Sequence, residues 1–317
     1  MSKKTLLSGI KPTGRPHIGN YFGLMKRIVE MQDEYQCYFF IADYHALTTM
    51  QNKEEMKQSI IDIVLDYAAI GFDPKKSIIF KQSDVPEHGE LAWIFDTITT
   101  MPYLQRAHAY KDAEAKGKEI SVGVFNYPML MAADILLYDT ALVPTGQDQK
   151  QHVEIARDTA EKFNHVYKTD IFTLPEPKII EELAVVPGID GRKMSKSYGN
   201  TIPLFASDEE IEKAVMGIVT DSSGDRPENV YAIHKLFKTE AELAPLYEEH
   251  KGKYKALKEA LIADLKAFIG PLREKRKHLA DDTDFVLDVL KEGGERAKQK
   301  AGKKMEAVRE AIGVKLY

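Results

Sequence analysis

The sequence predicts an α/β protein, with a Rossmann-type parallel sheet in residues 1–204 and an α-helical domain in residues 205–317. Two observations carry this prediction. Up to about Asn200, short apolar runs alternate with amphipathic stretches, which is the β-α-β order of a parallel sheet covered by helices. After Asp208 the strand-like runs vanish, and amphipathic segments follow one another to the end of the chain.

The individual elements follow from the apolar pattern. Thr5–Gly9 is expected to form the first strand, and a loop rich in Gly and Pro leads from it to a helix over Ile18–Asp33. Two further runs, Gln36–Ala42 and Ser77–Phe80, are short, apolar and typical of buried strands. Helical stretches are predicted at Glu54–Ile70, Gly89–Thr99, Pro128–Leu137 and Gln151–Phe163. In the helical domain, breaks are expected at Ser222–Pro227, Gly270-Pro271 and Gly293-Gly294.

Composition indicates an ordinary globular protein. Hydrophobic residues make up 44%, charged residues 29%, and the net charge is −5, so no global cationic field for nucleic acid exists. No apolar run approaches the ~20 residues of a membrane span, and the N-terminus lacks the apolar core of a signal peptide. Cys37 is the single cysteine, which excludes an intramolecular disulfide and a Cys-rich metal site. We expect a cytoplasmic protein without a metal site of its own.

The first motif is residues 16–20, Pro-His-Ile-Gly-Asn, directly after the first predicted strand and its loop. Ligands of doubly wound sheets bind beyond the carboxyl ends of the strands, and the next helix offers free N–H groups to phosphate. Gly19 would let a nucleotide approach the backbone, while His17 and Asn20 could donate hydrogen bonds. Alone the pattern is weak, because a histidine at a helix start is usually an ordinary polar residue.

The second motif is residues 191–197, Gly-Arg-Lys-Met-Ser-Lys-Ser. Lys193 and Lys196 are long, flexible cations that could follow charge onto a leaving pyrophosphate. The alternative is a solvated surface loop. Together the two motifs resemble the signatures of class I aminoacyl-tRNA synthetases, His-Ile-Gly-His (here ending in Asn20) and Lys-Met-Ser-Lys-Ser (a full match). The resemblance implies ATP binding by His17, Gly19, Asn20, Lys193, Met194, Ser195 and Lys196.

A third segment, residues 127–138, carries one carboxylate among apolar neighbours. On a helix Tyr127, Met131 and Asp134 share one face. A buried carboxylate needs a hydrogen-bond partner, and an indole N–H is a donor-only group. We therefore expect Asp134 to bind an indole while Tyr127 and Met131 pack on its ring. The alternative is that Asp134 faces water or pairs with an arginine.

This segment and those at residues 8–14, 42–48, 143–154 and 293–313 resemble tryptophanyl-tRNA synthetases over nearly the whole chain. The resemblance implies a Rossmann catalytic domain, a helical anticodon-recognition domain and a homodimer. It also implies ATP with Mg²⁺, L-tryptophan and its tRNA as ligands. It places Asp134 at the indole nitrogen. The pocket wall would be Met131, Val143 and Gly9, the substrate's polar end would meet Tyr127, His45 and Gln149, and ATP would also contact Gly146, Asp148 and Gln149.

Lysines mark two departures from the family pattern. Lys11 stands where glutamine is common, close to the point where two anions, the substrate carboxylate and the α-phosphate, must meet. We expect its charge to assist catalysis and ATP binding, the alternative being that it points into solvent. A loop lysine that helps to bind the triphosphate in relatives is shifted, so that three candidates stand open: Lys111, Lys116 and Lys118.

Three other functions remain open at this stage. A tyrosyl-tRNA synthetase shares the fold, but Leu7 is no hydroxyl partner for a phenol. A non-catalytic RNA-binding relative need not retain the full second motif, and a small-molecule nucleotidyltransferase would not need the helical domain. The stretch Lys291–Lys315 holds eight Lys or Arg and four Asp or Glu. It is either a docking patch for tRNA or a solvated helix face.

Overall fold

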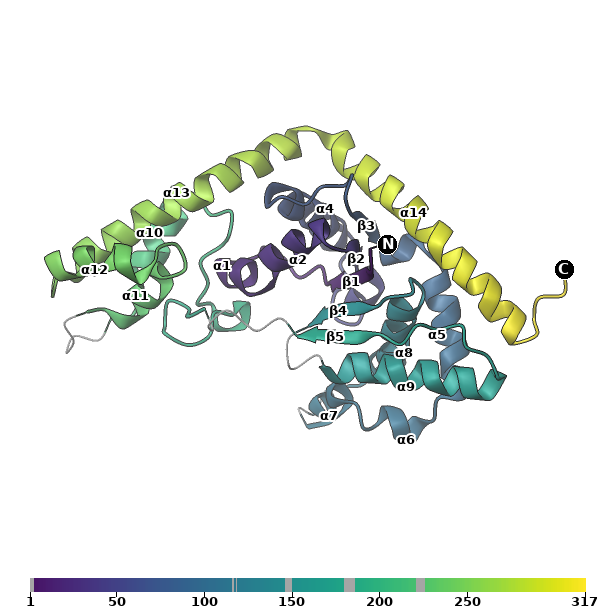
Figure 1. The fold of residues 1–317 in the computed structure, drawn as a ribbon. Helices are drawn as coiled ribbons and strands as arrows, with labels where there is room; N and C mark the ends of the chain where they lie inside the picture. Colours follow the sequence, from purple (N-terminus) through teal and green to yellow (C-terminus); the bar gives the residue numbers. More distant parts are fainter. Residues whose placement is uncertain (1–2, 116, 118, 146–149, 180–185, 221–225) are drawn as a thin grey trace.

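The computed structural model describes residues 3–115, 117, 119–145, 150–179, 186–220 and 226–317 (Figure 1). Within them lies a parallel sheet of five strands in the order β3-β2-β1-β4-β5. This confirms the predicted fold class. The strands are β1 Thr5–Ile10, β2 Gln36–Ile41, β3 Ile78–Lys81, β4 Leu142–Thr145 and β5 Glu176–Ile179.

The order of the strands reverses beside β1, because β2 and β3 extend the sheet on one side and β4 and β5 on the other. Such a switch point leaves a crevice at the carboxyl end of the central strands, where doubly wound proteins bind ligands. Strands β4 and β5 were not predicted. Each is four residues long and contains a proline, which donates no ladder hydrogen bond and disguises a strand in sequence.

Helices cover both faces of the sheet and continue to the end of the chain. Up to residue 167 they are α1 Ile18–Asn20, α2 Lys26–Glu30, α3 Asp43–Ala46, α4 Lys53–Ala69, α5 Glu87–Ile98, α6 Met101–Leu104, α7 His108–Ala115, α8 Val122–Leu136 and α9 Lys150–Tyr167. A π-helical turn, Tyr21–Met25, joins α1 to α2. The later helices are α10 Asp208–Met216, α11 Glu228–His234, α12 Glu240–Glu249, α13 Tyr254–Asp281 and α14 Thr283–Ala311.

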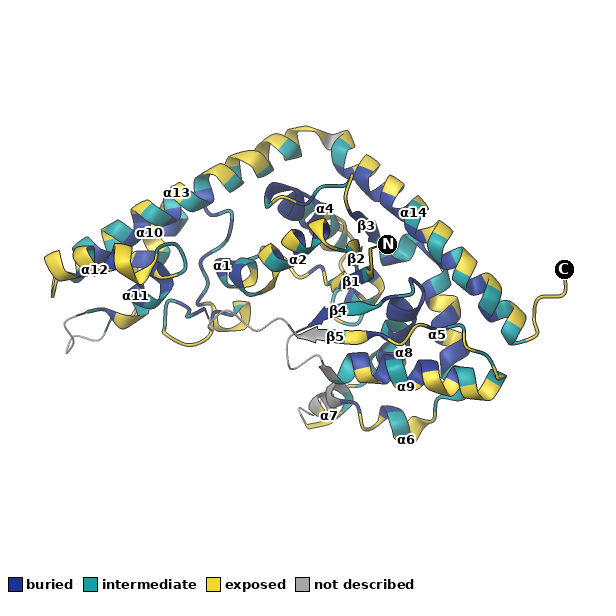
Figure 2. Ribbon diagram, in the orientation of Figure 1, coloured by how far each residue is buried: buried dark blue, intermediate teal, exposed yellow. Residues whose placement is uncertain are grey.

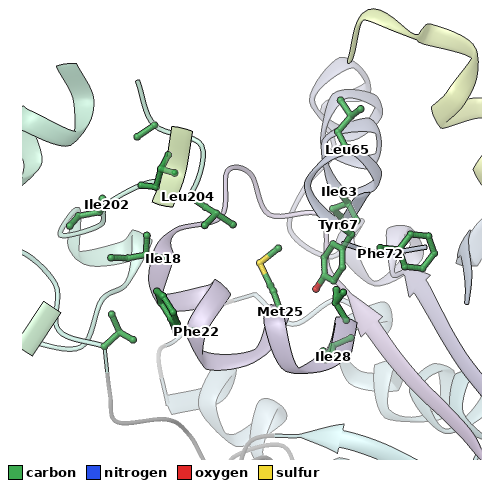
Figure 3. Close-up of a cluster of buried hydrophobic side chains, with 14 of the residues drawn as sticks. Ile18, Phe22, Met25, Ile28, Ile63, Leu65, Tyr67, Phe72, Ile202 and Leu204 are labelled. Carbon is green, nitrogen blue, oxygen red and sulfur yellow. The ribbon is translucent and has the colours of Figure 1, made fainter. Parts of the chain in front are cut away.

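Alternate residues of the strands enter two separate cores, one on each face of the sheet. Leu6, Phe39 and Ile79 pack with α2 and α4 in the first core. Figure 3 shows the apolar side of this helix pair, with Met25 and Ile28 turned toward Tyr67 of α4. On the opposite face, the second core holds side chains of β1–β3 together with α5, α8, α9 and α14. The helix after β1 is thereby fixed at the switch point.

The helical region folds back onto the sheet through its last helix (Figures 1 and 2). Ala297, Ala301 and Met305 of α14 are buried in the second core. The expected breaks at Gly270-Pro271 and Gly293-Gly294 are wrong, since α13 and α14 run through them and the chain turns instead at Asp282. Gly293 serves a close contact: a Cβ there would lie 1.8 Å from the carbonyl oxygen of Ile79. No helix in the described ranges is both long and apolar enough to span a membrane.

Candidate active site

His17 begins the first helix at the crevice and is locked in place by its own motif. Its backbone N–H donates to Oδ1 of Asn20 (3.0 Å), and the N–H of Asn20 donates to its Nδ1 (3.2 Å), a reciprocal cap. Burial, with a smaller effect of the Lys196 charge, lowers the pKa of His17 to about 4. The imidazole is thus neutral near pH 7. Because Nδ1 accepts, the proton sits on Nε2, which is a donor for an incoming anion.

The second motif lies directly against the first. Nζ of Lys196 donates to the carbonyl oxygens of Thr13 (2.8 Å) and Gly14 (2.9 Å) in the loop after β1. Met194 is buried, and a Cβ added to Gly19 would come within 3.3 Å of its Cβ. The two motifs therefore meet at the carboxyl end of β1, although they lie about 180 residues apart in sequence. Both were expected to bind ATP.

Asn200 shapes the second motif and was missed in the sequence. Its Oδ1 accepts the backbone N–H of Ser195 (2.8 Å), and its amide donates to Asp190 (2.7 Å) and to the carbonyl oxygen of Lys193 (3.1 Å). The side chain is buried, and a Cβ on Gly188 would strike it at 2.3 Å. An asparagine after a glycine is common in loops, so nothing in the sequence singled it out.

Asp134 of α8 is completely buried at the same edge of the sheet. Its Oδ1 lies 2.7 Å from Nε2 of Gln82 and 2.6 Å from Nδ1 of His88, and its Oδ2 lies 2.8 Å from Nε2 of His45. Burial raises the pKa of Asp134, but the hydrogen bonds and charges of His45 and His88 outweigh it and lower the pKa below its usual value. The group is an anion at neutral pH. The alternatives of a solvent-facing or arginine-paired Asp134 are wrong.

Of the other residues expected around an indole, Tyr127 is linked to this carboxylate through His45. Tyr127 presents its ring to the edge of His45 (centroids 6.2 Å apart), and its hydroxyl lies 3.3 Å from the His152 ring. Met131 and Val143 are half-buried beside the second core. His45, which was expected at the polar end of a substrate, contacts Asp134 itself. Gln82 and His88 had not been identified, because each enters from a different element and neither forms a motif with Asp134.

Lys11 and Gly9 stand at the end of β1. Lys11 is exposed as a whole residue, but partial desolvation of its ammonium group lowers the pKa of that group. A Cβ on Gly9 would lie 2.6 Å from the Phe40 ring, so only glycine fits against that neighbouring strand. Lys111 is exposed on α7. The remaining candidates, Gly146, Asp148, Gln149, Lys116 and Lys118, lie outside the described residues.

Comparison with known proteins identifies the same family along the chain. The family model described as "tRNA synthetases class I (W and Y)" matches residues 2–267 of this chain. A tryptophan–tRNA ligase of Fusobacterium nucleatum is 46% identical over 319 residues, covering 98% of each chain. One from Campylobacter jejuni is 45% identical, covering 98% of this chain and 99% of the relative. The crystal structure of tryptophanyl-tRNA synthetase from Campylobacter jejuni complexed with ADP and tryptophan is similar at a TM-score of 0.92 and 44% identity, covering 98% of this chain and 99% of that one.

Proposed function

Because the chain belongs to the class I tRNA synthetases for tryptophan and tyrosine, we propose that it is a tryptophan–tRNA ligase. It activates L-tryptophan with ATP to tryptophanyl-adenylate and pyrophosphate, and then transfers tryptophan to the 3′ end of tRNA(Trp). The observation that carries the choice of substrate is the buried Asp134 anion. It is an acceptor-only group that an indole N–H satisfies, and a site built around such a bond rejects substrates that lack the donor.

Adenylate formation needs no protein nucleophile. The tryptophan carboxylate attacks the α-phosphorus of ATP, and the protein positions the reactants and neutralises the developing charge. His17 would donate from Nε2 to a phosphate oxygen, with Asn20 and Gly19 at the same helix start. Lys193 and Lys196, supported by Met194 and Ser195, would follow the leaving pyrophosphate. The contact of Lys196 with the loop after β1 supports this role, because it brings the ammonium group to the nucleotide edge of the sheet.

Lys11 is proposed to act where the carboxylate and the α-phosphate meet. Its position directly after β1 supports that role, because ligands of doubly wound sheets bind beyond the carboxyl ends of the strands. Mg²⁺ is proposed to enter with ATP, because protein-bound Mg²⁺ of this kind is held largely by substrate phosphates and water. In the described part of the chain, no group of three or more His, Cys, Asp or Glu side chains could hold a metal ion.

The tRNA is proposed to dock on the helical domain, residues 205–317, and on the outer side of α14. Lys291, Lys298 and Lys303 are exposed there and are available to phosphates. Lys300 and Lys304 of the same helix both pair with Asp139, so the proposed tRNA surface does not include them. A homodimer and a cytoplasmic location complete the proposal. The buried free thiol of Cys37 suits a reducing compartment.

ATP–pyrophosphate exchange with each of the twenty amino acids tests the proposed function. Tryptophan should drive exchange about 10⁴-fold better than an amino acid without a matching donor, because Asp134 would be left unpaired. A Lys196→Ala variant should lose kcat while its tryptophan affinity, measured by calorimetry, stays near that of the parent. Exchange with tyrosine as fast as with tryptophan would contradict the substrate, and unchanged turnover in the variant would contradict the role of Lys196.

A further inference from the structure

His88 stands behind the proposed indole-binding carboxylate, out of reach of any substrate. It lies on α5 and is completely buried. Its Nδ1 is 2.6 Å from Oδ1 of Asp134, and its Nε2 is 2.7 Å from the hydroxyl oxygen of Tyr138. Aromatic rings enclose it: the ring centroids of Phe40, Phe80 and Tyr138 lie 6.1, 6.2 and 5.6 Å from that of His88. The imidazole is thus held at both ring nitrogens and packed among three aromatic rings.

The two carboxylate oxygens of Asp134 have different hydrogen-bond donors. An ionised carboxylate only accepts, so every neighbour within hydrogen-bond distance must donate. Gln82 and His88 both donate to Oδ1, whereas His45 alone donates to Oδ2. The other ring nitrogen of His88, Nε2, contacts the Tyr138 hydroxyl, a group that can donate or accept a hydrogen bond. Oδ1 is thus occupied by two buried donors, and Oδ2 keeps an acceptor site for a further one.

We propose that His88 is a positioning residue that sets the specificity of the enzyme for the indole N–H, by holding Asp134 so that Oδ2 faces the substrate. The inference rests on the proposed function and deepens it. Tyr138 holds the far nitrogen of the His88 ring, His88 together with Gln82 holds the carboxylate, and the carboxylate accepts the indole N–H. Without His88 the carboxylate would lose one of its two donors at Oδ1 and could turn about its terminal torsion, for which the rotamer wells are broad.

A pair of substrates isolates this effect. Tryptophan and β-(benzothiophen-3-yl)alanine have nearly the same shape, but sulfur replaces the indole N–H in the second. The ratio of their kcat/KM values in pyrophosphate exchange measures how well the enzyme reads the N–H. We expect His88→Leu to lower this ratio about 10- to 100-fold, the scale of one lost hydrogen bond to a charged group. His88→Asn, whose amide can still donate toward Asp134, should retain most of the ratio, and Tyr138→Phe should lie between the two.

A matched control is available in the helical domain. His234 is also buried, and its ring nitrogens lie 3.1 Å from the Tyr247 hydroxyl and 2.7 Å from Asp264. His234→Leu removes a similar network far from Asp134 in sequence and should leave the substrate ratio unchanged. The folded fraction of each variant is measured by circular dichroism. If His88→Leu does not fold, the ratios of His88→Asn and Tyr138→Phe decide.

The outcomes separate this inference from the proposed function. Absence of tryptophan-dependent exchange in the parent enzyme would overturn the proposed function. Normal exchange in the parent, with kcat/KM of both substrates lowered equally by His88→Leu, would overturn the positioning role and leave His88 a packing residue. An unchanged ratio in Tyr138→Phe together with a lowered ratio in His88→Leu would remove only Tyr138 from the relay.

Discussion

His17 is a buried imidazole that also caps a helix. Its protonation therefore affects the free energy of unfolding as well as the proposed binding of phosphate. Its pKa of about 4 in the folded protein is below the usual 6.5. Between these values the unfolded chain binds a proton that the folded chain does not, so the free energy of unfolding falls as pH falls from about 6.5 to about 4. Above pH 6.5 the full contribution, up to about 3 kcal/mol, is present.

The variant His17→Asn tests this linkage, because asparagine is a good N-cap without a titrating group. Urea unfolding of parent and variant between pH 4 and 8 gives the difference in unfolding free energy at each pH. We expect the parent to lose more stability than the variant as pH falls through this window. Other titrating groups, including the buried His234, are common to both proteins and cancel. Parallel stability curves would show that the His17 ring is not held neutral by the fold.

The placement of single residues could be predicted where the residues lie in one segment, because their spacing alone shows which of them share a helical face. The i, i+4, i+7 spacing of Tyr127, Met131 and Asp134 places them on one helical face, and α8 does carry all three. The partners of Asp134 were not predictable in this way. His45 follows β2, Gln82 follows β3 and His88 lies on α5, so that only the parallel sheet brings them together. The roles of these residues in binding remain predictions.

Among the elements, α14 owes its position to a glycine that the sequence suggested was a break. Gly293 lets the helix approach β3 so closely that a methyl group would overlap the Ile79 carbonyl oxygen, whereas a Cβ on Gly302 meets nothing within 4 Å. Gly293→Ala should therefore destabilise the protein by about 3 kcal/mol or more, as an overpacked core does. Gly302→Ala, in the same helix, should stabilise it by up to about 1 kcal/mol.

Urea denaturation followed by far-UV circular dichroism measures both changes, and the pair controls for the general effect of alanine on helix propensity. Equal shifts in the two variants would mean that α14 does not pack on β3 as described. The same contact explains the error in the sequence interpretation. Glycine lowers intrinsic helix propensity, so a Gly-Gly pair predicts an end, but tertiary packing outweighs about 1 kcal/mol per residue when a backbone must approach another closely.

For the whole molecule, the sheet and the helical region are joined by the last two helices rather than by a single linker. Arg276 of α13 pairs with Asp62 (2.6 Å) and Asp66 (2.5 Å) of α4, and Lys300 and Lys304 of α14 pair with Asp139 behind β4. Two basic residues of the stretch considered as an RNA-binding patch in sequence thus hold α14 to the segment just before β4. Charge alone could not show this, because the acidic partners lie at sequence separations of 161 for Lys300–Asp139 and 210 for Arg276–Asp66.

The proposed homodimer is the remaining question at this scale, and the surface offers a site for it. Trp93 on α5 is 70% exposed, Met101 on α6 is 64% exposed and Val122 at the start of α8 is 76% exposed. These helices pack on one another, since α8 contacts both α5 and α6. Large exposed apolar side chains on helices that pack together are candidates for an interaction surface. A second copy of the chain is the occupant that we propose.

Trp93 is the only tryptophan, so its fluorescence reports directly on this surface. We expect sedimentation of a dimer at micromolar concentration, and a shift of the emission to longer wavelength on dilution as Trp93 becomes solvated. Trp93→Glu and Met101→Glu should sediment as folded monomers, because each would bury an unpaired charge in the interface. Leu287→Glu, at an exposed position on α14, should remain dimeric. A monomer at all concentrations, with emission that dilution does not change, would contradict the dimer, and a dimer unaffected by both glutamates would place its interface elsewhere.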